Sequence, residues 1–167
     1  MAEETRGSTF YPDLVCRELK EKSFSFSATE TRHGRKLTIP LPAENAKELK
    51  AFLYVNPEGD CRIRIYLPCS ISREKISLLA PAVNELNSQY RFVNVYVDGD
   101  GDICVRYDFL LTGTDAELGM HVLKILILVE DIADECIPVI RDAIRKADRE
   151  KAEEDEFTVK TNLFQED

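Results

Sequence analysis

Residues 49–67 read LKAFLYVNPEGDCRIRIYL, and this stretch decides the predicted fold. On both sides of the turn sequence at residues 56–59, apolar side chains alternate with polar or aromatic ones, which is typical of two half-buried strands. The predicted inward positions are Leu49, Ala51, Leu53 and Val55 before the turn, and Cys61, Ile63, Ile65 and Leu67 after it. The stretch therefore predicts an antiparallel pair of strands with one buried face.

The segments before this pair predict a helix and one or two more strands. Pro12 suits the first turn of a helix that has Ser8 or Thr9 near its cap and ends near Lys22. Strict alternation over residues 23–29 predicts a half-buried strand, and a basic turn then leads into a short apolar stretch, residues 37–41. Because Pro40 has no amide donor, that stretch is expected to be a sheet edge or the start of a strand.

The segments after the pair predict two helices around a second hairpin. Ser72 suits the cap of a helix in which Pro81 predicts a kink. Alternating residues 93–97 and 103–109 then flank the sequence DGDGD at residues 98–102. Thr114 suits the cap of the last helix, which is predicted from Asp115 to about Lys151 with a bend at Pro138.

The predicted order is helix, three or four strands, helix, two strands, helix, which is typical of an α+β fold. A chain of 167 residues is the size of one domain, which we place at residues 9–152. Residues 1–8 are expected to be a flexible N-terminus and residues 153–167 an acidic, flexible tail. Within that tail, residues 157–164 are an alternative candidate for a strand added to a sheet edge.

Composition excludes several classes of function. The chain carries 22 Lys plus Arg against 31 Asp plus Glu, and its net charge of -9 disfavours nucleic acid and anionic lipid as partners. The acidic start MAEETRGSTF is unlike a secretory signal, and no apolar stretch approaches the roughly 20 residues of a membrane span. We therefore expect a cytoplasmic protein with no membrane partner.

Five cysteines are scattered through the chain without a C-x-x-C pair: Cys16, Cys61, Cys69, Cys104 and Cys136. An odd number without metal-ligand spacing favours small buried side chains in a reducing compartment over a disulfide or zinc framework. The alternative is a redox-sensing thiol, for which Cys61 beside Arg62 has the nearest basic neighbour.

Polar candidates for chemistry each have a more ordinary interpretation. The loop at residues 98–102 begins like an EF-hand, but Ile103 and Phe109 stand where that motif needs glycine and glutamate, so a hairpin turn is favoured. The basic cluster at residues 32–36 is interpreted as a solvated hairpin tip and alternatively as a phosphate site. Glu117 and His121 lie one helical turn apart, but two ligands are too few for a protein metal site.

A group of carboxylates in the last helix is the remaining polar candidate. It comprises Glu130, Asp131, Asp134 and Glu135, and is interpreted as a solvated face rather than a metal or acid–base site. Neither a nucleophile motif nor a glycine-rich phosphate loop occurs, so we expect no catalysis and no cofactor.

The last helix gives the positive evidence for a partner. A stripe of apolar residues at alternating spacings of four and three, from Leu118 through Val139 to Ala143, suits packing on the sheet. Further apolar residues widen that surface beyond one sheet contact. The candidates for a partner or dimer surface are Leu123, Leu126, Ile127, Ile137, Ile140 and Ile144. The alternative is a helix enclosed by its own domain.

Several phrases together resemble the YbjN-like family, whose members are described as candidate bacterial sensory transduction regulators. They are AFLYV at 51–55, CRIRIYLP at 61–68, Leu86-Asn87, VRYDF at 105–109, and Ala133-Asp134 with Pro138. The resemblance covers roughly residues 9–148 and implies a type III secretion chaperone-like fold of order α-β-β-β-α-β-β-α, frequently dimeric. It implies helices packed on one twisted antiparallel sheet and no established catalytic residues.

Two classes of function follow from these observations. The leading hypothesis is a non-catalytic protein-binding module, chaperone-like or regulatory, with another protein or a second copy as its partner. The alternative is a small metal-binding protein or enzyme that uses carboxylates and His121.

Overall fold

The computed structural model describes residues 10–112 and 115–163. Its elements, in chain order, are α1 (Tyr11–Glu21), β1 (Ser27–Thr31), β2 (Gly34–Leu41), β3 (Leu49–Val55), β4 (Asp60–Ser70), the 3₁₀ helix η1 (Arg73–Leu79), α2 (Ala80–Gln89), β5 (Asn94–Val97), β6 (Asp102–Leu110) and α3 (Asp115–Leu163). The predicted α+β order is confirmed, and the first group contains four strands.

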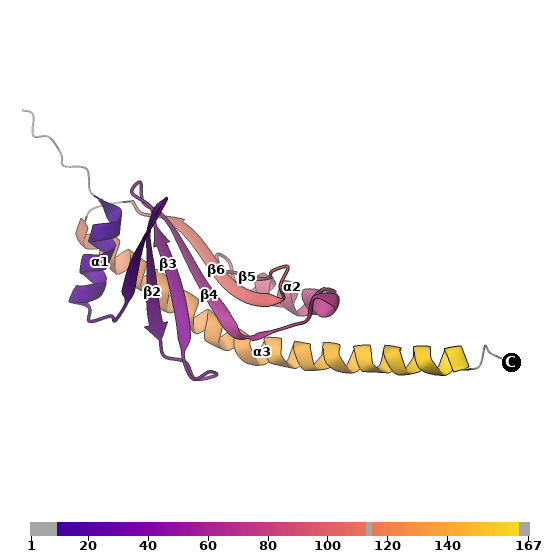
Figure 1. Ribbon diagram of the computed structural model, residues 1–167. Helices are drawn as coiled ribbons and strands as arrows, with labels where there is room; N and C mark the ends of the chain where they lie inside the picture. The colour runs from indigo at the N-terminus through magenta and orange to yellow at the C-terminus, as the bar shows by residue number, and fades with distance from the viewer. Residues whose placement is uncertain (1–9, 113–114, 164–167) are drawn as a thin grey trace, which may run out of the picture.

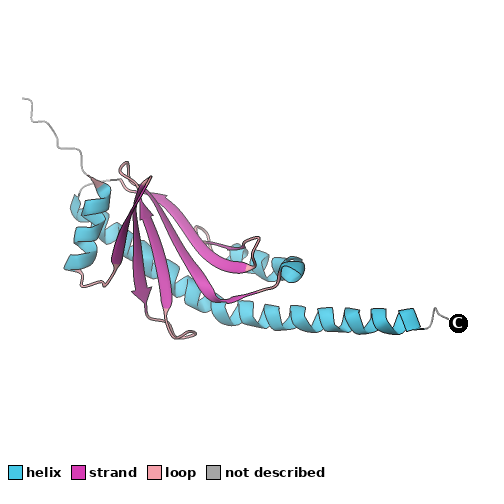
Figure 2. Ribbon diagram, viewed as in Figure 1, coloured by secondary structure: helices cyan, strands magenta, loops and turns pink. Residues whose placement is uncertain are grey.

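The strands form one antiparallel sheet in the order β1-β2-β3-β4-β6-β5. Figures 1 and 2 show that this sheet is twisted and that α3 crosses one of its faces. The predicted inward residues of β3 and β4 are all buried on that face, and pairs such as Ala51 with Ile65 fix their register. The central stretch therefore forms the hairpin that its alternation predicts.

The N-terminal hairpin differs from the prediction. Strand β1 begins at Ser27 rather than Ser23, and all five of its residues are exposed, so the predicted half-buried strand over 23–29 is wrong. Ser23 adopts a positive φ of 61°, which interrupts an extended segment, while Phe24 and Phe26 pack against the core ahead of the strand. The helix before it ends at Glu21, close to the predicted Lys22.

Strand β2 is longer than predicted because the basic turn is shorter. Only residues 32 and 33 connect β1 to β2, and Gly34, with φ of 133°, begins the returning strand. Strand β2 pairs on both sides, but β1 reaches only as far as Thr38, so Pro40 lies beyond its end. The missing amide of Pro40 therefore breaks no pair with β1, which reconciles the proline with an inner strand.

The second predicted helix is divided into two. Residues 73–79 form η1, and Pro81 lies in the first turn of α2. Proline is tolerated there because the first amides of a helix have no intrahelical partner, so the chain starts a new helix instead of kinking one.

Helix α3 begins at Asp115 as predicted but continues to Leu163, well past the expected end near Lys151. Residues 157–163 are helical rather than an added strand, and residue 164 lies outside the described residues, as do Ser8, Thr9 and Thr114. Ion pairs such as Lys146 with Glu150, at 3.8 Å, support a charged helix of this kind. Pro138 lies inside the helix, and Figure 1 shows a change of direction along it.

Candidate binding surfaces

Most of the predicted partner surface on α3 is buried in the chain itself. Leu126, Ile137 and Ile140 are fully buried and Leu123 is 6% exposed. The reason is that α3 contacts the sheet on one side and α1, η1 and α2 on others, so its own domain covers a wide arc of the helix. For these four residues the enclosed-helix interpretation is correct, and the partner assignment is wrong.

The remaining two predicted residues lie at or near the surface. Ile144 is half-buried against the core, and Ile127 is 48% exposed. Met120, Leu128 and Val139 are similarly exposed. At 3.6 residues per turn, Met120 lies above Ile127 and Leu128 lies below Val139, so the four residues share one arc of about 120° around the helix. We call these four residues the α3 outer face.

The sequence placed Val139 in the sheet-packing stripe, and this was wrong because it is 41% exposed. A stripe with alternating spacings of four and three repeats every 3.5 residues, whereas a straight helix repeats every 3.6. The resulting drift of about 20° per heptad turns Val139 away from the sheet by the end of the stripe. The α3 outer face therefore could not be read from spacing alone.

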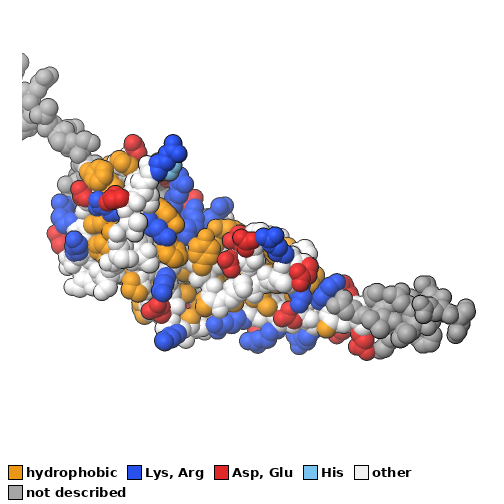
Figure 3. All heavy atoms as spheres, viewed as in Figure 1, with side chains coloured by type: hydrophobic (Ala, Val, Ile, Leu, Met, Phe, Trp, Pro, Cys, Tyr) orange, Lys and Arg blue, Asp and Glu red, His pale blue; other side chains and the backbone are white. Residues whose placement is uncertain are grey.

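A second surface is the open side of the sheet, which faces the viewer in Figures 1 and 3. Figure 3 shows lysine, arginine and hydrophobic side chains gathered there. We call it the cation–aromatic face and define it as Lys36, Phe52, Tyr54, Arg62, Arg64, Tyr66, Tyr96 and Arg106. Sequence alternation predicted that several of these residues point outward, but it did not predict which strands would bring them together.

Rings and cations are in contact on this face. The Lys36 Nζ atom lies 4.3 Å from the centroid of Phe52 and 5.7 Å from that of Tyr54. The Arg106 guanidinium lies 5.1 Å from the Tyr96 centroid. Such cation–π contacts hold the long cationic side chains against the sheet.

Like charges meet at the centre of the face. Arg64 and Arg106 are direct cross-strand neighbours, an arrangement that costs stability unless the charges find other partners. Arg64 forms an ion pair with Asp108, and Arg62 pairs with Asp60 at 3.0 Å. The face thus holds four cations next to two carboxylates on a chain whose net charge is -9.

The predicted basic tip contributes only partly to this surface. Arg35 is held by Glu30 at 2.5 Å and by Asp13 at 2.7 Å, and it ties the first hairpin to α1. A hollow of about 430 Å³ lies beside it and adjoins the cation–aromatic face at Tyr54 and Arg62. Arg35 is therefore a structural residue, and the solvated-tip interpretation does not hold for it.

One of the carboxylates of α3, Asp134, has a structural role. Asp134 is 8% exposed and accepts hydrogen bonds from the backbone N–H groups of Glu44, at 3.2 Å, and Asn45, at 3.0 Å. It therefore fastens the β2–β3 loop to α3, and the solvated-face prediction is wrong for this residue. The pKa of Glu130 is raised by burial and by the neighbouring Asp131 and Asp134.

No described residues form a metal site from three or more His, Cys, Asp or Glu side chains. The His121 ring packs against Phe109, with the centroids 6.0 Å apart. In the loop at residues 98–102, the Asp98 carboxylate accepts hydrogen bonds from the N–H groups of Asp100 and Asp102. This loop joins β5 to β6, which confirms the predicted hairpin turn.

The cysteines match the buried interpretation for four of five. Cys16, Cys61, Cys104 and Cys136 are buried, Cys69 is half-buried, and all are free thiols. Burial, with a smaller contribution from Asp60, raises the pKa of Cys61 to about 12. A thiol that stays protonated at neutral pH is a poor nucleophile, which argues against Cys61 as a redox sensor.

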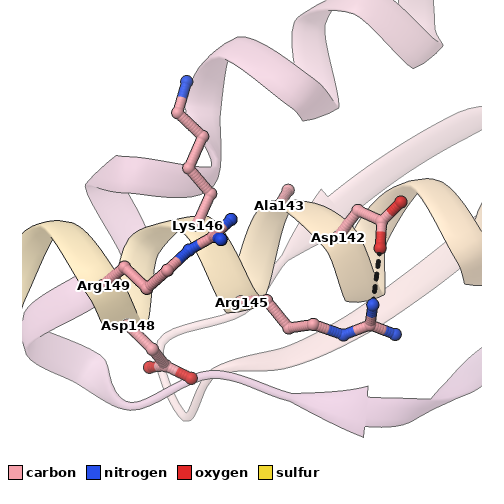
Figure 4. Close-up of a pocket in the computed structure, with 6 residues that line it drawn as sticks. All are labelled: Asp142, Ala143, Arg145, Lys146, Asp148 and Arg149. Carbon is pink, nitrogen blue, oxygen red and sulfur yellow. Dashed lines mark hydrogen bonds and ion pairs between the residues drawn. The ribbon is translucent and has the colours of Figure 1, made fainter.

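Another hollow, of about 680 Å³, is lined by residues of α3 alone. Figure 4 shows its six lining side chains projecting from one helix, with Arg145 paired to Asp142. Because all six lining residues belong to one helix, this hollow is an open part of the helix surface rather than an enclosed binding site.

Comparison with known proteins identifies the family. A family model named YbjN, described as "Putative bacterial sensory transduction regulator", matches residues 11–141. The chain belongs to the YbjN family. No curated protein matches the chain. The resemblance seen in the sequence is thereby confirmed.

One solved structure shows the same fold, and a second is less similar. E. coli YbjN, described as "a putative transcription regulator", has a crystal structure that matches with a TM-score of 0.53 and 13% sequence identity; the match covers 74% of this chain and 88% of that protein. The Yersinia pestis type III secretion chaperone SycH, crystallised with a stable fragment of YscM2, is 12% identical, covers 74% of this chain and 96% of its own, and has a TM-score of 0.46.

Two polar residues from the matching YbjN phrases have structural roles. Asp134 anchors the β2–β3 loop, as described above. The Asn87 side-chain amide donates to the Val95 carbonyl at 3.0 Å, and its oxygen accepts from the Val95 N–H at 2.7 Å. Asn87 thus occupies the outer edge of β5 as a neighbouring strand would, which protects that edge from pairing with another chain.

Among the residues that the structure describes, none of the helices combines the length and apolarity that a bilayer span requires.

Proposed function

We propose that this YbjN-family chain is a non-catalytic protein-binding module with a regulatory or chaperone-like role, and that the α3 outer face is its contact surface. The observation that carries the proposal is the exposure of Met120, Ile127, Leu128 and Val139, between 41% and 48%, on one side of a helix whose other sides pack against the sheet, α1, η1 and α2. Covering the exposed part of each side chain would contribute about 1 kcal/mol before the costs of association.

The proposed occupant of the α3 outer face is a protein surface, from either a second copy of the chain or a different partner. Charged residues Lys124, Asp131 and Glu135 lie among the four apolar ones. A mixed surface of this kind is typical of interfaces that form between separately folded proteins. Five free thiols agree with a reducing compartment, and we expect the chain to work in the cytoplasm.

Affinity capture from native lysate, combined with light scattering, tests this proposal. The baits are the wild-type chain, an Ile127→Glu/Leu128→Glu variant, and a control with Leu78→Glu/Phe92→Glu, whose two side chains are 36% and 61% exposed elsewhere. We expect the wild type and the control to retain a protein or to self-associate, and the α3 variant to lose this binding roughly tenfold or more.

Two results would overturn the proposal. One is a wild-type chain that stays monomeric and captures nothing. The other is an equal loss of binding in both variants, because both carry the same added negative charge and only one alters the α3 outer face.

A further inference from the structure

We propose that the cation–aromatic face binds an acidic segment of a partner protein. This face and the α3 outer face lie on opposite sides of the molecule, because α3 packs on the other side of the sheet. The inference therefore does not depend on the surface assigned above, and the two are tested with different variants.

Charge at the centre of the face favours a negative partner. Arg64 and Arg106 lie side by side on adjacent strands, and Asp108 neutralises only the first of them. Within the described residues, Lys36 and Arg106 contact rings and form no ion pair with a carboxylate. Carboxylates of a bound segment would supply the charge-assisted hydrogen bonds that these two cations lack.

The rings favour a protein over a simple ion. Tyr54 and Tyr66 are 36% and 43% exposed, and Tyr66 stands edge-on to Phe52 with the centroids 6.1 Å apart. Tyrosine and arginine together are typical of the residues that dominate binding energy at protein interfaces. A second copy docked through the same face is disfavoured, since it would bring arginines against arginines.

Nucleic acid is also bound by cations and aromatic rings, but the distribution of charge on this chain disfavours it as the ligand. Two of the four cations, Arg62 and Arg64, already pair with carboxylates of the chain. Nucleic acid extending beyond the face would meet the rest of a chain whose net charge is -9. A short acidic segment avoids that repulsion. Crossing the five strands that form the face, about 4.8 Å apart, covers roughly 19 Å, which about six extended residues span.

Fluorescence anisotropy with the full-length chain tests the inference. The probe is a labelled peptide of about six residues in which glutamate alternates with tyrosine, a length taken from the strand spacing. The comparison probes are the same peptide with glutamine in place of glutamate, and a single-stranded oligothymidylate. We expect the glutamate peptide to bind most tightly, and its affinity to fall as salt is raised.

Two charge-reversed variants supply the matched control. Arg106→Glu alters the face, and Arg145→Glu makes the same change in net charge on α3, where Arg145 is 70% exposed. We expect Arg106→Glu to weaken binding of the glutamate peptide tenfold or more, because one charge-assisted hydrogen bond is lost. Arg145→Glu should change the affinity less than twofold.

A third variant, Tyr66→Ser, tests the same face independently, in case Arg106→Glu does not fold. Thermal melting checks that each variant is folded. We expect Tyr66→Ser to weaken the peptide severalfold without altering net charge. The inference is overturned if no peptide binds, if the glutamine peptide binds equally well, or if oligothymidylate binds more tightly. Equal losses in Arg106→Glu and Arg145→Glu would also overturn it.

Discussion

Replacing Asp134 with alanine is expected to detach the β2–β3 loop from α3. The carboxylate accepts hydrogen bonds from two backbone N–H groups, of Glu44 and Asn45, and from the Asn45 side-chain amide at 2.9 Å. Hydrogen bonds to a charged group contribute about 1.5–3 kcal/mol each, but water can reach part of this loop and replace some of them. Alanine also gains about 0.5 kcal/mol of helix propensity over aspartate.

The net cost of Asp134→Ala should therefore be about 2 kcal/mol in the free energy of unfolding. Urea denaturation monitored by circular dichroism measures it, with Asp131→Ala as the control, because Asp131 lies on the same helix and is exposed. The control should change stability by less than about 0.5 kcal/mol. If the two variants were equally stable, the carboxylate would not be the anchor that its hydrogen bonds indicate.

Three other perturbations have defined outcomes. Gly101→Ala should cost at least about 2 kcal/mol, because Gly101 has φ of 88° and an added Cβ would lie 1.8 Å from the Ile71 carbonyl oxygen. Gly99→Ala, whose added Cβ would meet nothing within 4 Å, should leave the stability nearly unchanged; thermal melts of both variants measure the difference. Asn87→Ala should cost about 1–2 kcal/mol and increase aggregation measured by turbidity, because it uncovers the β5 edge; an unchanged melt and clear solution would argue against edge protection. Raising the pH from about 8.5 towards 12 should lower stability, because the Cys61 pKa is about 12 in the folded chain and near 8.5 when unfolded, so only the unfolded state loses the proton. The slope should approach about 1.4 kcal/mol per pH unit and should diminish in Cys61→Ala; a slope that this variant leaves unaltered would assign the effect to other groups.

The parts of the fold that were predictable are those in which a local pattern and its packing agree. Strands β3 and β4 alternate strictly because one face is covered by α3 and the other is open, and the printed sequence carries that signal directly. In β1 the same alternation was misleading. Phe24 and Phe26 pack against the core from an irregular segment. Residue spacing alone cannot distinguish such a segment from a strand.

The candidate surfaces were predictable only in part. A wide apolar helix indicated that α3 has more than one buried face, but contacts with α1, η1 and α2 decide which residues those faces contain. The cation–aromatic face draws residues from β2, β3, β4, β5 and β6, and only the strand order brings them side by side. Likewise, Asp134 looked like one acid of a solvated group until the loop that it binds, about 90 residues earlier in the chain, was in place.

Oxidative footprinting of the chain, alone and with its captured partner, would show whether the α3 outer face binds protein. Hydroxyl-radical labelling of Met120 reports on this face, and Phe92, at 61% exposure between α2 and β5, reports on a surface outside it. Labelling of Met120 should fall severalfold in the complex while labelling of Phe92 stays constant. A complex in which Met120 is labelled as fast as in the free chain would contradict this expectation.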